Sequence, residues 1–432
     1  MKRGRHRARH AIALAIAITI AIAPAIAAAQ AYLPPEALVD AALRAQPGVQ
    51  AAIARVDAAA GAARAREVGS HEFELSVIPQ QRNTRLEGRY REWEAQLSRS
   101  IRLPAKARLD REIGGHLRSA AGLRLDDAEH QAARRLLELW MNGLRQALAA
   151  DEASAQQALL TRERDALARR VALGDAARRD LDLFEAERAQ LAAQAVGARA
   201  AAVAARQMLA SEFPQLPLPA QAPPLPEPAA PPGEVADWRQ RIVERSHEIE
   251  IANEEAARLA LIAARTRADR TPDPTVGVRL ISDRGGAEKV VGLVLNIPIG
   301  TDYRSAMAVS ESANAAAAEA EAAGVRRAVE QAAWATAEAA QSRLVQWQAQ
   351  QQALVAQAAA SQRTRRAWEL GEAPLAEYLL AERSQRQARL AEALARVDAL
   401  QALLQLRVDT HELWHAEASR AGARDGGTAP TR

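Results

Sequence analysis

The chain has 432 residues, of which 49% are hydrophobic and only 3% are aromatic. This length accommodates two or three compact domains. The chain contains no cysteine, which excludes disulfides, thiol catalysis and cysteine-ligated metals. The formal net charge of +4 is small for the length, and no basic stripe with interleaved aromatic residues indicates nucleic-acid binding. The abundance of alanine, arginine, glutamate and glutamine is typical of long helices packed side by side.

Residues 1–29 have the pattern of a secretory signal peptide. Basic side chains are concentrated in residues 1–10, an unbroken run of Ala, Ile, Leu and Thr occupies 11–23, and Ala27-Ala28-Ala29 offers a cleavage site. The apolar run is shorter than the roughly 20 residues that a spanning helix needs, which favours cleavage over a membrane anchor. No later stretch is apolar enough to cross a bilayer as a helix, so we expect a mature chain that is periplasmic or crosses as strands.

The next part of the chain changes from a helical to a strand pattern. Residues 35–66 predict a helix that begins at a proline. Residues 72–78 and 92–103 alternate between apolar and polar side chains, which predicts two strands. A polar stretch at 80–89 connects them. Arg99 is the one misfit on the apolar side of the second strand, which suits a position near a rim.

Long helices follow, and the order then repeats. A helical run extends from Pro104 to about Leu173, and a return helix reaches about residue 213. Residues 213–233 hold nine prolines, as in an extended linker. The second half predicts a helix at 235–268, strands around 276–280 and 291–297, a long helix at 302–370 and a return helix at 375–415.

Two similar phrases, residues 173–188 and 370–383, indicate a tandem duplication. Each is a glycine break between helical runs, followed by an acid and leucines that restart a helix. Gly371 lies 197 positions after Gly174, and the landmarks 100–104 and 296–300 have an offset of 196. The expected organisation is a signal peptide at 1–29, a first helix–hairpin–helix repeat at 30–212, a Pro-rich linker at 213–234, a second repeat at 235–417 and a disordered tail at 418–432.

The four predicted strands each have one apolar and one polar face, and about the length of a tilted membrane strand. Four strands cannot close a barrel, and open edges are not tolerated in lipid, so several chains would have to share one barrel. The alternative is two soluble hairpins that cap a helical bundle. The residues assigned to the lipid face are Phe73, Leu75, Val77, Trp93, Leu97, Val276, Val278, Leu280, Val291, Leu293 and Leu295.

The duplicated order resembles the TolC family of bacterial outer-membrane efflux proteins. The resemblance rests on the two glycine-led phrases, on Asp273-Pro274 before the third strand, and on residues 295–300 after the fourth. It implies a mainly α fold with a β-barrel portion, in which long helical hairpins and four membrane strands per protomer are closed by homotrimerisation. It also implies a passive exit duct in the outer membrane, extending into the periplasm, with a periplasmic adaptor protein and an inner-membrane pump as partners. The expected substrates include heavy-metal cations, and no cofactor is expected.

The resemblance places the tip turns of the periplasmic entrance at Gly174 and Gly371. The family pattern has an acid six positions beyond each glycine, which gives Asp180 and Glu377, with Asp182 as an extra candidate. Where some members have a further aspartate, this chain has Leu380. A ring of carboxylates from three chains would favour cations. Alternatively, these acids only sit in the first helical turn, stabilised by the helix dipole.

Residues 411–415 read His-Glu-Leu-Trp-His, the H-E-x-x-H pattern of zinc proteases. The motif falls at the expected end of a terminal helix, and no convincing third ligand follows. We therefore interpret it as an incidental exposed histidine pair, and we expect neither a metal site nor an enzyme. The remaining alternative function is a soluble periplasmic helical scaffold or adaptor whose hairpins never enter lipid.

Overall fold

The computed structural model describes residues 32–86 and 88–415. The predicted signal peptide and the predicted tail at 418–432 lie outside these residues. The chain divides into two compact units, of which the first comprises Met1–Val49, Glu129–Arg245 and Ala332–Arg432, and the second Gln50–Ala128 and Ser246–Gln331. Each unit takes a corresponding part of both repeats, so the compact units are not the repeats themselves.

The helices follow the duplicated order. They are α2 (Glu36–Arg44), α3 (Pro47–Val68), α4 (Pro104–Ala172), α5 (Arg178–Glu212), α6 (Val235–Glu244), α7 (His247–Ala268), α8 (Asp302–Glu369) and α9 (Leu375–Asp409). The two long helices, α4 with 69 residues and α8 with 68, match the predicted runs, and each measures about 100 Å at 1.5 Å per residue. None of the helices that the structure describes is long and apolar enough to span a membrane.

Three helix boundaries differ from the prediction. The helix expected at 35–66 is two helices, because Pro47 starts α3 and its ring removes a backbone donor. The helix expected at 235–268 is also two, since Ser246 caps α7 by accepting a hydrogen bond from the Ile249 amide at 3.3 Å. The last helix ends at Asp409 rather than at His415.

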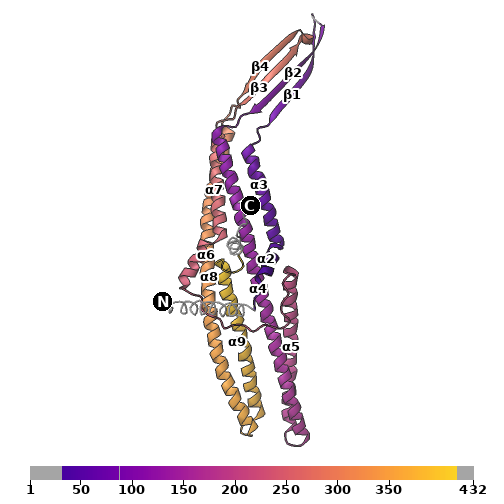
Figure 1. The fold of residues 1–432 in the computed structure, drawn as a ribbon, viewed down its shortest axis with the longest axis vertical. Coiled ribbons are helices and arrows are strands. Elements are labelled where there is room, and N and C mark those ends of the chain that lie inside the picture. The colour runs from indigo at the N-terminus through magenta and orange to yellow at the C-terminus, as the bar shows by residue number, and fades with distance from the viewer. Residues whose placement is uncertain (1–31, 87, 416–432) are drawn as a thin grey trace, which may run out of the picture. The chain divides into compact units, whose positions relative to one another are not determined.

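Four strands form one antiparallel sheet in the second unit, in the order β1-β2-β3-β4 (Figure 1). Their bounds are β1 (Phe73–Thr84), β2 (Gly88–Ser100), β3 (Thr275–Asp283) and β4 (Glu288–Asn296), and the short 3₁₀ turn η1 (Arg284–Gly286) joins the last two. The polar stretch expected as a connection at 80–89 belongs mostly to strands, since pairing continues to Thr84 opposite Gly88. The first hairpin therefore extends further than the second.

The register aligns the predicted apolar side chains in rows across the sheet. Leu75, Leu97, Val278 and Leu293 form one row, with similar rows on either side of it. We call this side of the sheet the apolar face. The predicted lipid-face residues on it are 42% (Leu280) to 90% (Leu293) exposed. Arg99 lies in the end row, opposite Phe73, and its guanidinium carbon is 4.9 Å from the centre of that ring.

An ion cluster around the buried side chain of Lys106 joins the sheet to the start of α4 within the second unit. The Lys106 side chain is 2% exposed, and its ammonium lies 3.0 Å from Asp273 and 3.1 Å from Asp269. The Leu103 amide also donates to Asp273, at 3.1 Å. Asp273 precedes β3, whereas Leu103 and Lys106 follow β2. The cluster thus ties the two hairpins to one helix end.

The core of the first unit gathers side chains from α2, α4, α5, α9 and the proline-rich linker. Leu136, Leu137, Leu144, Leu209 and Leu400 are among its buried members. The predicted linker has no helix or strand in the described structure, and part of it is packed. Its Leu216 is buried in this core, with Leu218 and Leu225 against it, and the Pro232 carbonyl accepts a hydrogen bond from the Trp238 indole at 2.9 Å.

Two glycines on the opposite face of the sheet provide a test of the pairing between the hairpins. A Cβ on Gly277 would lie 2.6 Å from the Leu97 carbonyl oxygen and 2.8 Å from the Ser98 Cβ, whereas a Cβ on Gly292 would meet nothing within 4 Å. We expect Gly277→Val to cost about 1–3 kcal/mol, because β2 and β3 would have to separate. Gly292→Val is the matched control and should be neutral or slightly stabilising. Thermal unfolding followed by circular dichroism measures both, and equal midpoints for the two variants would contradict the β2–β3 register.

Candidate functional site

The turns between the long helices and their return helices are built alike. Gly174 and Gly371 have left-handed backbones, with φ of 83° and 75°. The Asp175 amide donates to the Arg170 carbonyl at 2.9 Å, and the Glu372 amide donates to the Ala367 carbonyl at 2.8 Å. This is the hydrogen-bond pattern of a glycine-terminated helix, and glycine adopts its left-handed backbone without strain.

The three acids predicted at the entrance lie in the first turns of the return helices. Asp180 is the third residue of α5 and Glu377 the third of α9, where the helix dipole stabilises negative charge. Asp180 lies 3.8 Å from Arg179 and has a side chain that is 26% exposed. Asp182 pairs with Arg178 at 3.0 Å on an exposed surface. The two equivalent acids, Asp180 and Glu377, therefore occupy matching positions, and Asp182 has no counterpart at this point in α9.

An apolar cluster packs the two long-helix hairpins together near these turns. Leu160 and Leu167 come from α4, Phe184 and Leu191 from α5, and Tyr378 from α9. The Trp368 ring of α8 stacks on Tyr378, with centroids 4.7 Å apart and an angle of 4° between the planes. Because the cluster draws on all four helices, separating the hairpins would expose it.

Polar contacts reinforce this packing across the hairpins. The Tyr378 hydroxyl donates to Glu163 of α4 at 3.1 Å, and Arg365 of α8 lies 3.0 Å from the same carboxylate. Burial raises the pKa of Tyr378 well above its usual range, and the negative charges of Glu163 and Glu382 raise it further. Tyr378 is thus a neutral hydrogen-bond donor at any physiological pH.

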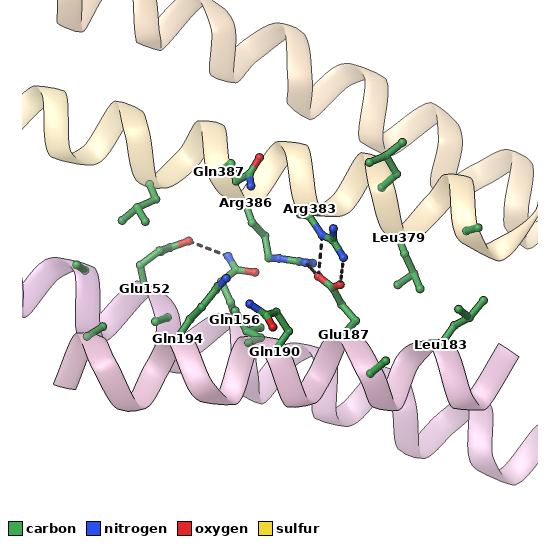
Figure 2. A pocket seen from close by; sticks show the side chains of 18 residues that line it. Glu152, Gln156, Leu183, Glu187, Gln190, Gln194, Leu379, Arg383, Arg386 and Gln387 are labelled. Atoms are coloured by element: carbon green, nitrogen blue, oxygen red, sulfur yellow. Dashed lines mark hydrogen bonds and ion pairs between the residues drawn. The ribbon is translucent and has the colours of Figure 1, made fainter. Parts of the chain in front are cut away.

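A second set of polar contacts lies in a cleft of about 1030 Å³ between α4, α5 and α9 (Figure 2). Glu187 of α5 is buried, and its two oxygens pair with Arg383 and Arg386 of α9. The ion-paired hydrogen bond to Glu187 raises the pKa of Arg383. In both links the first hairpin supplies the acid and the second the arginines. We call the contacts of Glu163 and Glu187 the cross-hairpin links.

The H-E-x-x-H motif does not form the geometry of a zinc protease helix. His411 and Trp414 have positive φ angles of 59° and 55°, so the segment after α9 is not helical. The rings of His411 and His415 stack in parallel, with centroids 4.1 Å apart. The prediction of an exposed histidine pair is wrong, because His415 is buried and His411 is partly buried.

For the residues predicted at the entrance, the structure shows where each lies within its own turn. The two glycines and the acids Asp180 and Glu377 occupy equivalent turns, as the duplication suggested. The cross-hairpin links were missed. Glu163 and Arg365 lie far apart in the sequence, and both occur in helical runs in which arginine and glutamate are frequent everywhere. No local signal marks them.

Comparisons with known proteins give structural matches only. No protein-family model and no curated protein sequence matches the chain. The outer-membrane channel OprN has a TM-score of 0.68 and 20% identity, with 89% of this chain and 92% of that chain covered. The outer membrane protein VceC from Vibrio cholerae has a TM-score of 0.70 and 18% identity, with 88% and 97% covered. The Campylobacter jejuni CmeC outer membrane channel has a TM-score of 0.65 and 14% identity, with 92% and 90% covered. The chain therefore has the fold of these outer-membrane proteins.

Proposed function

We propose that this protein is an outer-membrane exit duct, a passive channel that receives substrates from an inner-membrane pump through a periplasmic adaptor protein. The observation that carries the proposal is the exposed apolar face, which continues in register across all four strands. A contiguous apolar surface of this kind is rare on soluble monomers and marks a membrane or protein interface. The shared fold with outer-membrane channels favours lipid as the covering.

The sheet itself supports a homotrimer. Within the described residues, β1 and β4 are edge strands, with no neighbour on their outer sides. In lipid each unpaired backbone group would cost several kcal/mol. Pairing β4 of one copy with β1 of the next removes both edges, and three copies would give the twelve strands that a closed barrel can use.

Fractionation of cells that produce the full chain tests the proposal. We expect the protein in outer-membrane fractions, extracted only by detergent, as a heat-modifiable trimer that conducts ions in planar bilayers. A freely soluble periplasmic monomer would overturn the proposal and would favour the helical scaffold instead. Passive conduction through the duct requires no catalytic step in this protein, because the pump supplies the energy.

We also propose that Asp180 and Glu377 form the anionic constriction of the periplasmic entrance. Three copies would bring six carboxylates to one aperture and favour cations such as metal ions. In Asp180→Ala/Glu377→Ala trimers we expect the cation preference of the bilayer conductance to fall several-fold. If these acids only stabilise helix starts, conductance will be unchanged and each substitution will lower stability by about 0.3–1 kcal/mol. Measuring ion selectivity and thermal stability on the same preparation separates the two cases.

A further inference from the structure

The apolar face changes character at the end where the hairpins turn. The rows of apolar side chains end at a row formed by Pro79, Trp93, Ser282 and Lys289. Beyond it the longer first hairpin continues alone, with Arg91 opposite Gln81 and Arg89 opposite Asn83. Since side chains alternate along a strand, Lys289, Arg91 and Arg89 lie on the same face as the apolar rows. We call these three exposed residues the basic row.

Among the described residues, the positive charges of the basic row lack acidic partners, unlike those on the other face. At the same level of the opposite face, Arg82 lies 3.2 Å from Glu92 and 3.7 Å from Asp283. The register places Glu92, Asp283 and Glu288 all on that opposite face. For the basic row, by contrast, no ion pair is recorded within residues 32–86 and 88–415. Among the described strand residues at this end, Lys289, Arg91 and Arg89 thus place unpaired positive charge on the side of the sheet that carries the apolar rows.

The position of the basic row fits the headgroup region of a membrane. Trp93 lies in the last of the apolar rows before the hairpin turns. Tryptophan side chains are enriched at membrane–water interfaces. At about 3.3 Å per residue, Arg91 lies roughly 7 Å and Arg89 roughly 13 Å beyond Trp93 along the strand. These distances span a lipid headgroup layer, and arginine binds phosphate oxygens through two parallel hydrogen bonds.

We propose that Lys289, Arg91 and Arg89 bind the phosphate groups of phosphorylated lipids in the outer leaflet. This inference rests on the proposed function, because it requires the apolar face to contact lipid. A membrane-borne phosphate is favoured over a free phosphate ion because the basic row is continuous with the apolar rows. One lipid can thus place its acyl chains against Leu280 and Val291 and its phosphates against the arginines.

Binding of lipid A to the detergent-solubilised trimer, measured by native mass spectrometry, tests this proposal. Each basic residue near a membrane surface contributes about a fivefold gain in affinity. We expect Arg89→Gln/Arg91→Gln/Lys289→Gln to bind diphosphorylated lipid A on the order of 100-fold more weakly than the wild type. Arg82→Gln is the matched control, because it removes an arginine at the same level from the opposite face, and its binding should be unchanged. Lipid A stripped of both phosphates should bind the wild type and the triple variant equally.

Three outcomes would overturn the inference. They are an unchanged affinity in the triple variant, equal binding of phosphorylated and phosphate-free lipid A by the wild type, and displacement of lipid A by an equimolar amount of inorganic phosphate. If the triple variant fails to form trimers, Arg91→Gln alone should still weaken binding about fivefold. Bilayer conductance of the same preparations keeps the two proposals distinguishable. If the triple variant conducts and its lipid A binding is unchanged, only the proposed lipid contact of the basic row is rejected. If the wild type does not conduct, the proposed function as an exit duct is rejected.

Discussion

Replacement of Lys106 by methionine should destabilise the protein by about 3 kcal/mol, because it leaves the largely buried carboxylate of Asp273 without its cation. Lys106 is 2% exposed and is within 3.1 Å of both Asp269 and Asp273. Methionine keeps most of the side-chain volume, so the loss reports charge rather than packing. We expect a large drop in the thermal midpoint and a reduced yield of trimer. Arg108→Ala is the control, since Arg108 is exposed two residues further along the same helix, and it should change stability by less than about 0.5 kcal/mol.

The same cluster predicts how the effect of Lys106→Met depends on pH. Burial by itself raises the pKa of Asp273, but the Leu103 amide and the Lys106 ammonium outweigh it and hold that pKa below its usual value. A depressed folded pKa adds stability above the unfolded pKa of about 4, and this stability is lost as pH falls through the folded pKa. The difference between wild type and Lys106→Met should therefore be largest near neutral pH and shrink below about pH 4. A difference that is constant from pH 7 to pH 3 would show that the Lys106–Asp273 pair contributes nothing.

The fold could be predicted largely because its signals are local and occur twice. Alternation placed Phe73, Leu75 and Val77 on one side of a strand, and the structure confirms that they share the exposed apolar face. The ends of the strands were less predictable. Where both faces of a strand contact water, polar residues such as Arg82 join the β-ladder as readily as apolar residues. Hydropathy therefore does not mark where β1 ends.

The contacts between hairpins could not be predicted, because helical periodicity is weak in this chain. Small alanine side chains allow helices to pack through several faces, so the sequence does not reveal which side of α5 meets α9. Asp273 is an intermediate case. The Asp273-Pro274 pair could be recognised as a landmark before β3, but its role as the acceptor for Leu103 and Lys106 requires the spatial join between the hairpins.

Removing the cross-hairpin links should open the entrance of the proposed channel. In the described structure, Glu163 accepts a hydrogen bond from Tyr378 and forms an ion pair with Arg365. Glu187 forms ion pairs with Arg383 and Arg386. An opening that separates α4 and α5 from α8 and α9 must break both links. Because Glu187 is buried, loss of its charge alone costs about 3 kcal/mol, which corresponds to a shift of about a hundredfold in a closed–open equilibrium.

We therefore expect Glu163→Gln/Glu187→Gln trimers to show several-fold higher bilayer conductance than the wild type. Glu185→Gln is the matched control, since Glu185 lies two residues from Glu187 on α5 and has no recorded cross-hairpin partner among the described residues. It should conduct like the wild type.

Tyr378→Phe separates hydrogen bonding from charge, because it keeps the ring stacked on Trp368 and removes only the hydroxyl that reaches Glu163. Its effect should be smaller than that of the double variant, since Arg365 still pairs with Glu163. Unchanged conductance in the double variant, with trimers intact, would mean that the links stabilise the subunit without controlling its opening.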